Sequence, residues 1–125
     1  METRWLGKVL LAALAALWLG VAAAQAHHGW SAYSDEPFAL TGVVEAVELG
    51  QPHGHLRVRA DGGLWDVVLG PPARNRRAGL VDGAVAVGAT VTAYGKRYRD
   101  PDRLEMKTER LQAGDRLFEI YPERL

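Results

Sequence analysis

The residues of this sequence best suited to chemistry are its four histidines, which lie in two short stretches. His27 and His28 stand in "AHHG", and His53 and His55 stand in "QPHGH". The neutral imidazole ring is the commonest protein ligand for metal ions, and its nitrogens suit copper, zinc and nickel. The pattern therefore predicts a metal site made of His27, His28, His53 and His55.

The residues that precede His27 have the three parts of an export signal. Arg4 and Lys8 form a charged start, an apolar run follows, and "AQA" at 24–26 fits the rule of small residues at a cleavage site. The alternative is a retained membrane anchor, but the apolar run is shorter than the roughly 20 residues that span a bilayer. We expect a cleaved signal peptide over 1–26 and a periplasmic protein, which touches the membrane only through the uncleaved signal.

A cut after Ala26 would make His27 the first residue of the mature chain. Its α-amine and its ring nitrogen Nδ1 could then bind one ion together, and an amine of ordinary pKa gives up its proton to copper near neutral pH. A third nitrogen would come from His28 or from His53, whose loop Pro52 stiffens. Among divalent ions such nitrogen donors favour copper, with zinc and nickel as weaker candidates.

Composition narrows the other functions that this chain could have. Its formal net charge is zero, whereas nucleic-acid-binding domains usually carry a basic excess, so nucleic acid is not expected as a partner. It has no cysteine, which excludes disulfides and thiolate sites. No nucleophile frame or phosphate-loop spacing supports an enzyme. Arg74, Arg76 and Arg77 could hold an anion or simply form a solvated helix face.

Residue patterns predict an all-β domain. Alternating or β-branched stretches predict five strands, at 38–49, 55–60, 64–70, 90–98 and 104–112. A short helix is expected within 71–80, opened by prolines and ended by Gly79. Three strands, a helix and two strands is the order of a small five-stranded OB-like Greek-key barrel. We expect this barrel over 38–125, preceded by an irregular, histidine-containing arm at 27–37.

Individual residues of the expected barrel can also be assigned. Gly42 within the first strand predicts a bulge or a sharp bend. Phe118, Ile120 and Tyr121 in the tail could pack on the barrel or add a short strand. The expected core comprises Leu56, Val58, Trp65, Val67, Leu69, Val91 and Met106.

These stretches together resemble a family of small exported bacterial proteins of unknown function, DUF6152. The resemblance rests on "AHH" after the signal, "LTGVVEAV", "QPHGHLRV", "WDVVLGPPARNRRAGL" and "GATVTAYG". It implies that the paired histidines and the histidine after Pro52 form one site, although Gln51 replaces the family's asparagine and His55 lies outside the family pattern. The family implies no activity.

Two functions follow as expectations. The first is a periplasmic OB-fold protein that binds copper, or another divalent ion, and acts as a carrier, a buffer or an accessory to a metalloenzyme. The second is a metal-free binding module for a small ligand or for an envelope protein partner. A hydrolase or an oxidase has little support from these residues.

Overall fold

The computed structural model of this protein describes residues 29–125. The chain divides into two units, 1–32 and 33–125, and in the first of them residues 29–31 are helical. The predicted signal peptide, with His27 and His28, lies outside the described residues. No helix within 29–125 is long and apolar enough to cross a membrane.

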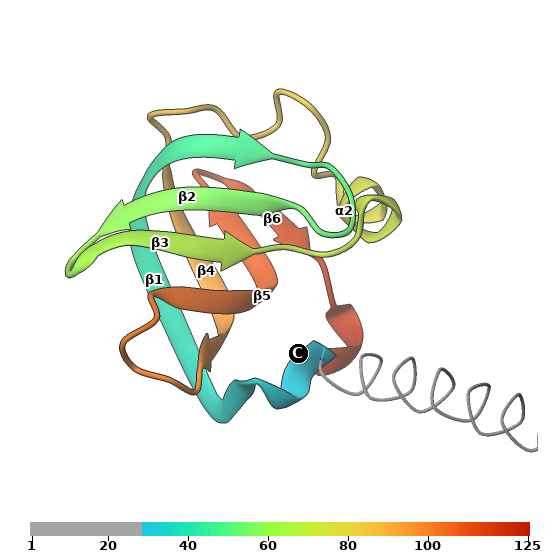
Figure 1. Ribbon diagram of the computed structural model, residues 1–125. Helices are drawn as coiled ribbons and strands as arrows, with labels where there is room; N and C mark the ends of the chain where they lie inside the picture. Colours follow the sequence, from blue (N-terminus) through green and yellow to red (C-terminus); the bar gives the residue numbers. More distant parts are fainter. Residues whose placement is uncertain (1–28) are drawn as a thin grey trace, which may run out of the picture. The chain divides into compact units, whose positions relative to one another are not determined.

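The unit 33–125 consists of strands with two short helical segments (Figure 1). In chain order the elements are β1 (Tyr33–Glu48), β2 (His55–Ala60), β3 (Gly63–Val68), α2 (Pro72–Ala78), β4 (Thr90–Tyr98), β5 (Glu105–Ala113), β6 (Arg116–Glu119) and the 3-10 helix η1 (Pro122–Arg124). The five predicted strands and the helix between the third and the fourth are confirmed. The tail adds the short sixth strand.

Strand pairing closes the first five strands into a barrel. The antiparallel order is β3-β2-β1-β4-β5-β6, and β3 also pairs with β5 in parallel. One edge of β5 pairs with β4, whereas the other pairs first with β3, at Glu105–Lys107, and then with β6, at Arg110–Ala113. The barrel therefore closes unevenly, because β3 pairs with only a short part of β5. The β1-β2-β3-β5-β4 order of the strands is that of the expected OB-like barrel.

The first strand begins five residues earlier than the sequence predicts. Tyr33 pairs with Tyr98 and Pro37 with Lys96, while the register shifts between these two pairs. The polar residues 34–36 form this irregular stretch, so they show no alternation that would reveal a strand. The prediction of an irregular arm over 27–37 is therefore wrong from Tyr33 onward, since these residues belong to β1 despite the register shift.

Gly42 lies where β1 passes from its pairing with β4 to its pairing with β2. A Cβ atom at this position would lie 2.3 Å from the carbonyl oxygen of Arg59 and 2.7 Å from the Val58 side chain. The residue must therefore be glycine because two strands meet there without room for a side chain. The sequence predicts a bulge or a sharp bend at Gly42, and the structure shows that the backbone of β1 comes close to Val58 and Arg59 of β2 at this residue.

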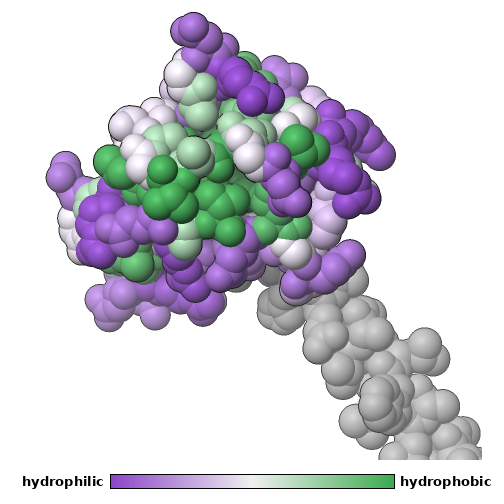
Figure 2. Space-filling view, turned by 90° about the horizontal axis from the view of Figure 1, so that it is seen from above, coloured by the Kyte–Doolittle hydropathy of each residue, from purple (hydrophilic) through white to green (hydrophobic). Residues whose placement is uncertain are grey.

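The core of the barrel agrees with the alternation of the sequence. All seven predicted core residues are at most 3% exposed, and Phe118, Ile120 and Tyr121 of the tail are buried as well. Apolar side chains also gather on the outside, on the face seen in Figure 2. The exposed valines of the unit include Val43, Val81 and Val87, of which the last two belong to the 79–89 connection between α2 and β4.

Candidate functional site

The loop that carries His53 is fixed to the end of β3 and to the helix. The amide of Gly54 donates to the carbonyl of Gly70 at 2.9 Å, and the amide of Leu69 donates to the carbonyl of Gly54 at 2.8 Å. The side chain of Asn75, which is 1% exposed, accepts from the Gly70 amide at 2.9 Å and donates to the Gly70 carbonyl at 2.7 Å. These bonds join the loop, β3 and α2 directly before β2 begins.

Gly54 is needed at this junction for reasons of space. A Cβ atom there would lie 2.7 Å from Nδ2 of Asn75, which is itself held by Gly70. The neighbouring Gln51–Pro52 peptide bond is cis. Since His53 directly precedes Gly54, the two backbone bonds of Gly54 hold the backbone beside His53 in place.

His53 is half-buried, and its ring favours the neutral form. Burial lowers the pKa of the ring, and the nearby positive charge of Lys107 and the neighbouring His55 lower it further. A neutral imidazole has a free nitrogen lone pair and can bind a metal ion without first releasing a proton.

His55 opens β2, and a carboxylate from the next strand holds its ring. Nδ1 of His55 lies 2.8 Å from Oδ1 of Asp66, and Nη1 of Arg57 lies 3.9 Å from the other oxygen of the same carboxylate. When the neutral ring donates Nδ1–H to Asp66, Nε2 is left as the nitrogen with a lone pair. Many metal-binding histidines are oriented by a carboxylate in this way.

Strand register places these side chains in two rows on the outer face of β2, β3 and β5. His55, Val68 and Lys107 form one row. Arg57, Asp66 and Glu105 form the other row. The two rows therefore place the His55 ring and the carboxylates of Asp66 and Glu105 next to the positively charged side chains of Arg57 and Lys107.

The β5 end of these rows is buried and polar. The hydroxyl of Tyr33 donates to Oε2 of Glu105 at 2.5 Å, and Nη2 of Arg103 lies 3.0 Å from Oε1 of the same carboxylate. Burial, followed by the Glu105 hydrogen bond, raises the pKa of the Tyr33 phenol. Nζ of Lys107 lies 5.9 Å from the centre of the Tyr33 ring, and burial lowers the pKa of this amine.

The structure thus brings two of the four predicted metal ligands to one surface. We call His53, His55 and Asp66 the histidine cluster. Among residues 29–125, no group of three or more His, Cys, Asp or Glu side chains is arranged to hold a metal ion. The prediction for His27 and His28 lies outside the described residues.

Sequence reasoning missed four residues around the cluster, namely Tyr33, Asp66, Glu105 and Lys107. Asp66 is placed beside His55 by the β2–β3 register, and a hairpin counted back from the turn at Asp61–Gly63 could have indicated this. Glu105 and Lys107 reach this face through the parallel β3–β5 pairing, for which the sequence carries no local signal.

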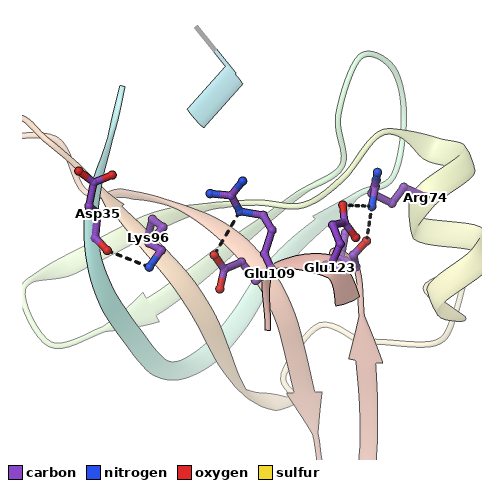
Figure 3. Close-up of polar contacts among 7 residues, drawn as sticks. Asp35, Arg74, Lys96, Glu109 and Glu123 are labelled. Atoms are coloured by element: carbon purple, nitrogen blue, oxygen red, sulfur yellow. Dashed lines mark hydrogen bonds and ion pairs between the residues drawn. The ribbon is translucent and has the colours of Figure 1, made fainter. Parts of the chain in front are cut away.

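The three arginines of α2 do not line one common cleft. Nη1 of Arg74 donates to Glu123 at 2.8 Å and to the carbonyl of Ile120 at 3.3 Å, so this side chain fastens the C-terminal segment to the helix (Figure 3). Arg74 and Arg77 both line a cleft of about 490 Å³ beside β6, together with Glu119 and Glu123. Arg76 lines a different cleft of about 210 Å³ beside Leu49, so the three arginines do not form one anion site.

Solved structures similar to this chain have low sequence identity to it. The chain matches the Stn1–Ten1 complex of S. pombe with 17% identity and a TM-score of 0.49, covering 63% of this chain and 58% of that one. It also matches the complex of TiaS with a tRNA and ATP, with 17% identity and a TM-score of 0.47, covering 62% of this chain and 18% of that one. The chain spans less than two thirds of the length of either.

Comparison of the sequence with known families identifies the family of this chain, which the solved structures do not. No curated protein matches the chain significantly. A family model described as "Family of unknown function (DUF6152)" matches residues 15–109, which include the loop with His53 and the whole of β1 to β4. The chain therefore belongs to the DUF6152 family.

Proposed function

We propose that this protein binds copper in the bacterial periplasm and serves as a carrier, a buffer or an accessory factor for a metalloenzyme. The observation that carries the proposal is the ring of His55, which Asp66 holds at 2.8 Å beside a second histidine whose pKa is lowered. The cluster thus offers two imidazoles, one oriented by a carboxylate and one that favours its neutral form.

Two imidazoles leave most positions of a bound ion open. An ion held in this way exchanges readily, which suits a carrier or a buffer more than a permanent structural site. The sequence adds His27 and His28 as further nitrogen donors if the signal is cut after Ala26. Nitrogen donors select Cu(II) over Zn(II) and Ni(II) by the general order of affinities, so copper is the metal proposed.

The neighbouring cation works against metal binding. Lys107 lowers the pKa of His53 and would also repel a divalent cation. Its own pKa is lowered by burial and by the charge of Arg124, so its amine gives up its proton more easily than an exposed lysine does. Binding of a cation should promote loss of that proton.

The test is Cu(II) affinity, measured by competition with a chelator on protein recovered from the periplasm with its native N-terminus. His53→Ala and His55→Ala should each weaken binding by about tenfold or more, the lower range for disturbing a metal site. Asp66→Asn should weaken it less, since it changes only the orientation of the His55 ring. Arg57→Gln is the matched control, since it removes the other group near Asp66 and no nitrogen ligand.

The sequence prediction for the arm is tested separately by one additional residue before His27, which removes the α-amine chelate. If this change alone weakens binding, the arm holds copper and the histidine cluster does not. If neither the added residue nor the cluster variants change affinity, copper binding is wrong. The alternative, a metal-free binding module for a small ligand or an envelope protein, then becomes the better proposal.

A further inference from the structure

A bulge in β5 turns two consecutive charged side chains toward one cleft. Tyr94 of β4 pairs with Arg110 of β5. The next pair is Gly95 with Thr108, so Glu109 has no partner in the ladder. Consecutive residues of a regular strand point to opposite faces, yet Glu109 and Arg110 both line a cleft of about 380 Å³. We call this the bulge cleft, and bulges that redirect side chains in this way are frequent next to binding and active sites.

The same bulge brings the C-terminal segment to the cleft. The carbonyl of Glu109 accepts the amide of Ile120 at 2.9 Å and that of Tyr121 at 3.0 Å. Nε of Arg124, the last residue of η1, lies 3.5 Å from Oε1 of Glu109 (Figure 3). The bulge cleft is therefore lined by β1, β4, β5 and the C-terminal segment together.

Three cationic side chains line the bulge cleft, against one carboxylate side chain. Arg124 is paired with Glu109, whereas Nζ of Lys96 donates to the backbone carbonyl of Asp35 at 3.0 Å (Figure 3). Within residues 29–125, neither Lys96 nor Arg110 forms an ion pair with a carboxylate. Two positive charges of the cleft are therefore left for an anion from outside the described residues.

The guanidinium of Arg110 is held in place beside an apolar wall. Its carbon lies 4.5 Å from the centre of the Tyr94 ring, and its Nε is buried without an acceptor among residues 29–125. Stacking fixes the plane of the guanidinium, so less side-chain entropy is lost when it binds a ligand. Pro37, Phe38 and Ala39 of β1 add the apolar wall to the same cleft.

From these observations we propose that the bulge cleft binds a small organic carboxylate, with its charge on Arg110 and Lys96 and its apolar part on residues 37–39. The planar fork of an arginine matches the two oxygens of a carboxylate. Glu109 repels a doubly charged phosphate ester more than a singly charged carboxylate. A volume of about 380 Å³ suits a small molecule. The proposal does not depend on copper binding.

NMR titration of the isotope-labelled protein with its native N-terminus, at constant ionic strength and with benzoate as the probe, tests the site. Backbone amide shifts should saturate and lie at 37–39, 94–96 and 109–110. Arg110→Gln should raise the dissociation constant of benzoate at least about tenfold, the loss expected for hydrogen bonds to a charged group. Lys96→Gln, the second variant, should raise it less, since a lysine makes no bidentate contact.

Arg116→Gln is the matched control. Arg116 is also stacked on an aromatic ring, with its guanidinium carbon 4.8 Å from the centre of the Phe118 ring, but it does not line the bulge cleft. This variant removes the same charge and should leave the dissociation constant unchanged. Circular dichroism of each variant establishes that the barrel is folded.

The absence of saturable shifts with benzoate would refute the proposal. Equal weakening by Arg110→Gln and Arg116→Gln would also overturn it, because general charge attraction would then explain the binding. Acetate and phenyl phosphate test the two parts of the ligand. Acetate as tight as benzoate would exclude the apolar contact, and phenyl phosphate tighter than benzoate would exclude a carboxylate as the preferred group.

Discussion

The histidine cluster and the exposed valines of β1 and of the 79–89 connection depart from the usual distribution of residues in opposite ways. Beside the cluster, the outer face of β5 buries charged residues, with Glu105 6% exposed and Lys107 5% exposed. Elsewhere, Val43 of β1 and Val81 and Val87 of the connection leave apolar side chains in solvent. The comparison teaches that covering by other side chains decides burial here. The Tyr33 side chain lies against both Glu105 and Lys107, whereas the exposed valines have no comparable cover.

The largest expected effect concerns the barrel that supports both surfaces. Trp65 is 3% exposed, and its ring lies 5.5 Å from that of Phe38 and 4.7 Å from the guanidinium carbon of Arg97. Trp65→Ala should lower the free energy of unfolding by about 3–5 kcal/mol, a large part of the stability of a small domain. Urea denaturation measures this loss, and a change below about 1 kcal/mol would show that the core tolerates the cavity.

A smaller effect is expected where charge is buried beside the histidine cluster. Tyr33→Phe removes the hydroxyl that donates to Glu105 at 2.5 Å and leaves that carboxylate with its Arg103 pair. The free energy of unfolding should fall by about 1–3 kcal/mol, the usual cost of an unsatisfied buried polar group. An unchanged midpoint in urea would mean that water replaces the phenol. Tyr98→Phe is the control, since it keeps the edge-on ring contact with Tyr33.

The smallest effect is a dependence of stability on pH that arises at the histidine cluster. The folded state lowers the pKa of His53, so the unfolded chain binds a proton more readily as pH falls through about 6.5. Stability should therefore decrease between pH 7 and pH 5, and His53→Gln should reduce this slope. Denaturation midpoints at several pH values provide the measurement. Equal slopes in both proteins would show that other groups cause the acid sensitivity.

The sequence predicts the interior of this protein better than its surfaces. Alternation in residues such as Leu56 and Val58 follows directly from a strand with one buried face, and Gly79 ends α2 with a φ of 92° as a helix-ending glycine does. By contrast, the contact of His55 with Asp66 depends on register, and the burial of Lys107 depends on pairing between distant strands. Such facts arise only when the barrel closes, so local patterns do not carry them.

The junction of Gly54, Gly70 and Asn75 has a consequence for engineering and for evolution. One carboxamide belongs to α2, yet it fixes the carbonyl that receives the amide next to His53. The histidine loop therefore cannot be grafted onto another barrel as a separate piece, since the graft would lack Gly70 and Asn75, which hold the loop in place. A copy that keeps the loop conformation must include residues 53–75 as one block, and insertions within α2 would disturb the loop as directly as insertions within the loop itself.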